Sequence, residues 1–227
     1  MPATILAGRY RYELTPDDVL WLARAGACEA GGRPGAIRAV IWTYLARAAM
    51  AEVSSLSSLV QRHSQPLNPI WQRTGEKCRP PDGEWYDRCY TNTRGARVCP
   101  CSEAALERRE RCSTLTWTQV APVVREAVTA VLAGAVPNPV PKAVDFAAGL
   151  SPRAGLELVR EVDGNQFYSN RESRSWPANF VRLVGVTGES VDEALVAARD
   201  AASAVGPAVA VASVVAAAWY FYGRPRA

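Results

Sequence analysis

Two helical patterns near the start of the chain, separated by a glycine-rich break, most constrain how it can fold. The first pattern begins at Thr15 and Pro16, followed by two acidic residues, which is typical of a helix N-terminus. It ends at Gly31 and Gly32, because glycine favours the backbone conformation that terminates helices. The second pattern carries an apolar stripe at helical spacing: Ile37, Val40, Ile41, Tyr44, Leu45 and Ala48. A third, shorter helix is expected over residues 54–60.

Glu29 lies in the last turn of the first predicted helix. At about 100° per residue it falls beside Leu22, at the edge of the apolar face. A carboxyl group held there is partly desolvated, so its pKa rises and it can stay protonated near neutral pH, as a general acid requires. The alternative is an ordinary solvated glutamate at a helix end, which the pattern alone does not exclude.

Charge and histidine content exclude several classes of function. The formal net charge of +4 suits an anionic surface such as cell wall or lipid headgroups, and is too small to indicate a nucleic-acid partner. A single histidine, His63, argues against a Ser-His-Asp triad and a histidine-rich metal centre, and is itself more typical of a surface or structural residue. We expect no metal and no cofactor. Residues 1–12 lack a long apolar run, so no secretory signal is predicted there.

Residues 72–113 differ from the rest of the chain in composition: they include five of the six cysteines, together with prolines, glycines and charged residues. Disulfides would suit such a coreless segment and would each contribute about 2–4 kcal/mol. A zinc site is the alternative, but Cys99 and Cys101 are too close and the other gaps too wide for paired zinc ligands. We therefore favour disulfides, with four of the five cysteines paired inside the insertion and the fifth free or paired elsewhere. Cys28 is expected to be a small buried thiol.

The second half of the chain predicts a further helix over residues 120–132, a rigid proline-rich connector over 136–141 and a short strand over 181–186. With no other strand pattern, the sequence predicts a mainly α fold.

A C-terminal helix is expected over residues 190–223, and it includes an uncharged stretch, 201–222, that is long enough for a membrane anchor. Aromatic residues at the end of this stretch and two arginines beyond it suit a membrane interface. A buried Ala/Val helix is the alternative, because the stretch lacks leucine and Pro207 interrupts it.

Several of these segments, in this order, resemble the cell-wall hydrolase family that includes the spore-cortex-lytic enzymes, within the lysozyme-like transglycosylases. Residues 29–35 resemble the segment that carries the catalytic glutamate of that family, although Cys28 and Gly31 depart from it. Further blocks of similarity lie at 131–139 and 165–177. Together they cover residues 17–180, interrupted by the cysteine-rich insertion.

The resemblance implies a lysozyme-like helical domain over residues 13–187, interrupted by the insertion at 72–113. It implies that Glu29 is the general acid that cleaves the β-1,4 bond between MurNAc and GlcNAc in peptidoglycan. Trp71 can stack on a sugar ring or anchor the core. The residues expected to bind substrate are Ser64, Gln65, Trp71, Tyr168 and Asn170.

The expected reaction is lytic transglycosylation with a 1,6-anhydro product, because no second carboxylate stands out beside Glu29; hydrolysis stays open. An anchored wall-degrading enzyme without a leader suggests a bacteriophage protein, either a virion component or a lysis protein. Its catalytic domain would face the periplasm and cell wall. The expected partners are peptidoglycan strands, the lipid membrane, and either virion proteins or further copies of the chain. A non-catalytic, membrane-bound assembly protein of a virion on the same fold is the alternative.

Overall fold

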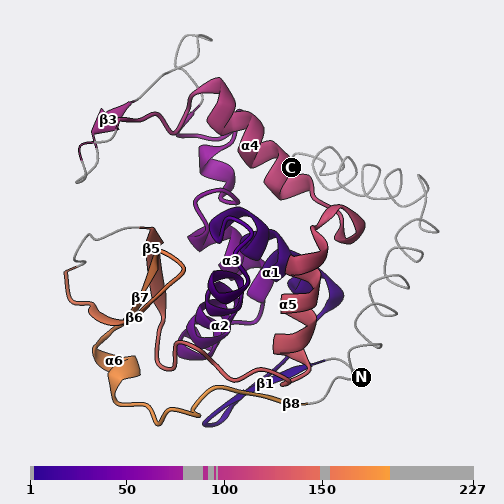
Figure 1. Ribbon diagram of the computed structural model, residues 1–227, viewed down its shortest axis with the longest axis vertical. Helices are drawn as coiled ribbons and strands as arrows, with labels where there is room; N and C mark the ends of the chain where they lie inside the picture. The colour runs from indigo at the N-terminus through magenta and orange to yellow at the C-terminus, as the bar shows by residue number, and fades with distance from the viewer. Residues whose placement is uncertain (1–2, 79–88, 92–94, 96, 149–153, 185–227) are drawn as a thin grey trace, which may run out of the picture.

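The computed structural model in Figure 1 describes residues 3–78, 89–91, 95, 97–148 and 154–184. Of these residues, 45% are helical and 18% lie in strands, so the prediction of a mainly α, lysozyme-like fold is wrong. The described part of the chain combines helices with three small antiparallel sheets. Its helices are α1 (Pro16–Glu29), α2 (Pro34–Ala51), α3 (Leu56–His63), α4 (Glu103–Thr114), α5 (Pro122–Leu132) and α6 (Arg171–Arg174). Its strands are β1 (Thr4–Ala7), β2 (Tyr10–Glu13), β3 (Tyr90–Thr91), β4 (Arg97–Val98), β5 (Asp145–Ala148), β6 (Glu157–Val162), β7 (Asn165–Ser169) and β8 (Arg182–Val184).

The core is built around α2, which packs against α1, α3 and α5 (Figure 1). Most of the α2 side chains are buried, and the predicted stripe from Ile37 to Ala48 is fully buried. At the start of α1, Asp18 accepts hydrogen bonds from the Thr15 backbone N–H and from the Ser57 N–H at the start of α3. One buried carboxylate therefore joins the N-terminal ends of two helices.

Strands β1 and β2, which the sequence analysis did not predict, form a three-stranded sheet with β8. β1 pairs antiparallel with β2 and also with β8, with Thr4 opposite Val184. The residues that precede the predicted domain start at 13 therefore belong to one sheet with residues 182–184. The predicted strand over 181–186 is confirmed for residues 182–184 as β8, and residues 185 and 186 lie outside the described part.

The second three-stranded sheet, ordered β5-β7-β6, lies beside the helices (Figure 1). Asp163 and Gly164 join β6 to β7, both with positive φ, the backbone geometry of a tight hairpin turn. Asp163 Oδ2 also accepts a hydrogen bond of 2.9 Å from the Ala36 N–H, in the first turn of α2. A Cβ at Gly35 would lie 2.6 Å from the Asp163 carboxylate, so a larger residue at this position would displace that side chain. The turn thus fixes the sheet to the N-terminus of α2.

The cysteine-rich segment is held by disulfides, as predicted. Cys78 pairs with Cys101 and Cys89 pairs with Cys99, both within the predicted insertion. The fifth cysteine, Cys112 on α4, pairs with Cys28 at the end of α1. The prediction of a free thiol at Cys28 is therefore wrong, and the zinc alternative is excluded because all six cysteines are in disulfides.

The predicted C-terminal helix over 190–223, with its membrane anchor at 201–222, lies outside the described residues. Among the residues that the structure describes, no helix has both the length and the apolar character needed to cross a bilayer.

Candidate functional site

A cleft of about 580 Å³ opens at the C-terminal end of α1. Three parts of the chain line it. The helical side contributes Glu29, Arg47, His63 and Gln65; the β5 and β7 side contributes Asp145, Phe146, Ala147 and Asn165; the β3–β4 hairpin contributes Tyr90 and Val98. A second hollow of similar volume lies on the outer face of α5, where Arg125 and Glu126 are its charged lining residues.

Glu29 is half-buried at the edge of the helical core, as the helical spacing predicted. Ser64 Oγ donates a hydrogen bond of 2.7 Å to Glu29 Oε1. Burial raises the pKa of the Glu29 carboxyl, while the hydrogen bond from Ser64 and the charges of Arg108 and Arg47 lower it; burial outweighs these three. The side chain therefore holds its proton to higher pH than an ordinary glutamate does.

Ser64 is positioned by the end of α3. It is the C-cap residue, its backbone N–H donates to the Val60 carbonyl, and its side chain is fully buried. A fully buried hydroxyl supports the Glu29 carboxyl from within the protein. In this structure Ser64 is not part of the cleft surface.

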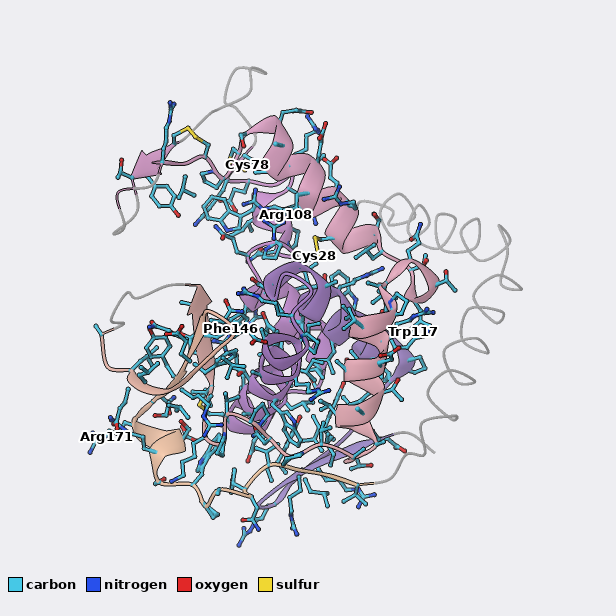
Figure 2. All side chains as sticks on the ribbon, viewed as in Figure 1. Cys28, Cys78, Arg108, Trp117, Phe146 and Arg171 are labelled. Atoms are coloured by element: carbon cyan, nitrogen blue, oxygen red, sulfur yellow. A yellow bond between two sulfur atoms is a disulfide. The ribbon has the colours of Figure 1, made fainter. Side chains whose placement is uncertain are left out.

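Helix α4 brings a cation to the end of α1. Arg108 Nη2 donates a hydrogen bond of 2.9 Å to the Cys28 carbonyl, and the disulfide to Cys112 fixes the same turn covalently. Figure 2 shows Arg108 next to Cys28 at the junction of the two helices. A positive charge is favourable at the C-terminal end of a helix, where unpaired carbonyls accumulate.

Asp145 is a second carboxylate in the cleft, where sequence reasoning expected none beside Glu29. Arg47 Nη2 forms an ion pair of 2.7 Å with Asp145 Oδ1, and Arg47 Nε donates to the Val144 carbonyl at 2.8 Å. The pair joins α2 to the start of β5. Sequence reasoning missed Asp145 because it lies 98 positions from Arg47 in the chain.

His63 also lines the cleft, although its type and position suggested only a structural or surface residue. Partial burial, followed by the charges of Arg47 and Arg62, lowers the pKa of its imidazole, against the opposing effect of Asp145. A lowered pKa favours the neutral ring, which can both donate and accept a hydrogen bond.

Asn165 is the polar residue that β7 contributes to the cleft. Its side chain is buried, and its Nδ2 has no hydrogen-bond partner within the described ranges. An unpaired buried donor costs about 1–3 kcal/mol.

The remaining predicted substrate residues lie in different places. Gln65 lines the cleft with Glu29, but Trp71 packs on a separate apolar cluster with Leu106 and two cysteines. Tyr168 is buried and donates a hydrogen bond to Gln166, and Asn170 caps α6 by accepting from the Ser173 N–H. The structure therefore brings Glu29, Ser64 and Gln65 together, while the other three are not among the described residues that line the cleft.

Comparison with known proteins identifies no relative: no family model, no curated protein and no solved structure matches this chain. The resemblance to cell-wall hydrolases therefore stays a prediction.

Proposed function

We propose that this protein is a peptidoglycan-degrading glycosidase that cleaves the β-1,4 bond between MurNAc and GlcNAc, with Glu29 as its general acid. The observation that most supports this function is the position of Glu29. It is a half-buried carboxyl with a raised pKa, held by Ser64 at the side of a cleft. General acids for glycosidic bonds need such an environment, because they must keep a proton near neutral pH and then release it.

In the proposed reaction, Glu29 donates its proton to the bridging oxygen as the bond from that oxygen to C1 of MurNAc breaks. Positive charge then develops on the MurNAc ring, and the GlcNAc hydroxyl leaves. The Glu29 carboxylate next accepts a proton from the nucleophile that attacks C1. If the 6-hydroxyl of the same MurNAc attacks, the product is a 1,6-anhydro sugar; if water attacks, the product is a reducing end.

Other groups in the cleft fit an N-acetylated sugar. Gln65, which lines the cleft, offers both a donor and an acceptor for an acetamido group. Arg47 and Asp145 form an ion pair in the same cleft, and their polar atoms add hydrogen-bonding groups for the hydroxyls of a sugar.

The disulfides bear on where the protein acts. Three disulfides in a chain of this size are typical of an oxidising compartment, outside the cytoplasm. We infer that the protein works on the envelope side, in contact with the cell wall. Membrane contact and virion association stay predictions, because they rest on residues 201–222, outside the described part.

The test is digestion of purified peptidoglycan by the full chain, with released muropeptides identified by mass spectrometry. Glu29→Gln keeps the shape of the side chain but removes the acid, and is expected to lower the rate about 100-fold or more. Glu126→Gln, at an exposed residue of α5 that lines the second hollow, is the matched control and should digest like the wild type. Wild-type protein that releases nothing, or a Glu29→Gln variant as active as wild type, would refute the proposal. Binding of peptidoglycan without release would instead favour the non-catalytic assembly protein.

A further inference from the structure

Tyr90 is an exposed aromatic residue inside the cleft. Three large hydrophobic side chains are more than half exposed in the described part of the chain: Tyr90 (52%), Leu158 (52%) and Val184 (53%). Of these three, Tyr90 alone lines the cleft with Glu29. It comes from the cysteine-held segment, whose role the proposed reaction does not explain.

The β3–β4 hairpin presents Tyr90 together with an aliphatic neighbour. Tyr90 and Val98 are directly opposite in the antiparallel register, so their side chains lie together, and both line the cleft. On the β5 side of the cleft, the corresponding apolar residues are Phe146 and Ala147. The rings of Tyr44 and Phe167 pack against Phe146, with their centroids 5.7 and 5.8 Å from the centroid of the Phe146 ring.

The disulfides explain how so short a hairpin keeps its position. Strands of two residues have too little pairing to be stable alone. Cys89 precedes Tyr90 and Cys99 follows Val98, and their disulfide joins the two strands directly beside the cleft residues. The Cys78–Cys101 disulfide then connects this hairpin to the buried cluster around Leu106.

The cleft thus has apolar groups on two sides and polar groups on the helical side. A pyranose ring has the same distribution, with C–H groups on its faces and hydroxyl and acetamido groups around its edge. Aromatic faces suit the apolar faces of such rings. We propose that the β3–β4 hairpin is a sugar-binding subsite in which Tyr90 stacks on a ring of the glycan strand; this inference rests on the proposed function.

The test measures binding of a GlcNAc–MurNAc tetrasaccharide by calorimetry, in the Glu29→Gln background so that the ligand stays intact. Adding Tyr90→Ala should weaken binding about tenfold, because one stacking contact is lost. Tyr90→Phe keeps the aromatic face and should bind within about twofold of the parent. Leu158→Ala, at an equally exposed residue outside the cleft, should leave binding unchanged.

Steady-state digestion by otherwise wild-type protein gives a second measurement. Tyr90→Ala is expected to raise KM while kcat changes little, because a stacking contact stabilises the bound substrate and the transition state equally. Equal affinity of the Tyr90→Ala variant and its parent would overturn the subsite and leave the function of Glu29 intact. Tyr90-dependent binding by a wild-type protein that does not cleave would support the subsite and overturn the enzymatic function. No binding at all by the Glu29→Gln protein would overturn the subsite.

Discussion

Removing the disulfide between Cys28 and Cys112 should destabilise the fold more than removing either of the other two. The two cysteines are 84 residues apart. The Cys78–Cys101 disulfide lies between them, so the loop that the Cys28–Cys112 disulfide closes is effectively roughly 60 residues long. The chain-entropy relation then gives a loss of about 4 kcal/mol for the Cys28→Ala/Cys112→Ala variant. For a chain of this size, that loss corresponds to a fall in Tm of about 8–16 °C.

The assay is urea-induced unfolding followed by circular dichroism, with the free energy of unfolding obtained by linear extrapolation. The matched control is Cys89→Ala/Cys99→Ala, whose cysteines are only 10 residues apart, with an expected loss of about 3 kcal/mol. A loss below about 1 kcal/mol for the Cys28–Cys112 pair, or a larger loss for the control, would refute the reasoning from loop length.

Two further predictions concern charged side chains, the exposed Arg108 and the buried Asp18. Arg108→Gln removes a positive charge that lowers the pKa of Glu29, so this pKa should rise further. In the proposed reaction the protonated acid is the active form, so the falling alkaline limb of the pH–rate profile should move to higher pH. A limb that does not move would contradict this. Asp18→Ala leaves the Ser57 N–H and the Tyr12 hydroxyl without their acceptor, so the free energy of unfolding in urea should fall by about 3–5 kcal/mol. Asp18→Asn keeps an acceptor oxygen and should lower this free energy less.

Helices α1 and α2 could be predicted because their periodic patterns run over 14 and 18 residues, and Thr15 marks the first start. The partial burial of Glu29 could be predicted from the same periodicity, because the helical spacing places this residue at the edge of the apolar face in the last turn of α1. Most strands escaped prediction because they have two to six residues, too few for alternation to be recognised. One signal was nevertheless present: Asp163-Gly164 between two short runs is a typical hairpin turn.

The non-helical half of the site could not be predicted for a different reason. Tyr90 and Asp145 reach the cleft through a disulfide-linked hairpin and through an ion pair with Arg47. Arg47 and Asp145 are 98 positions apart, and the spacing of the cysteines does not determine that Cys89 pairs with Cys99, so no local pattern predicts either contact. The partner of Cys28 was hidden in the same way, because pairing depends on how α4 docks against α1.

The pairing of β1 with β8 has a practical consequence for handling this protein. Residues 4 and 184 are neighbours in one sheet, at the end of the molecule away from α4 and β3 (Figure 1). A linker attached at either edge of this folded body would start far from the mouth of the cleft. Immobilising the protein on a bead or sensor through that sheet should therefore leave the side that carries the cleft open to a ligand as large as a polymer.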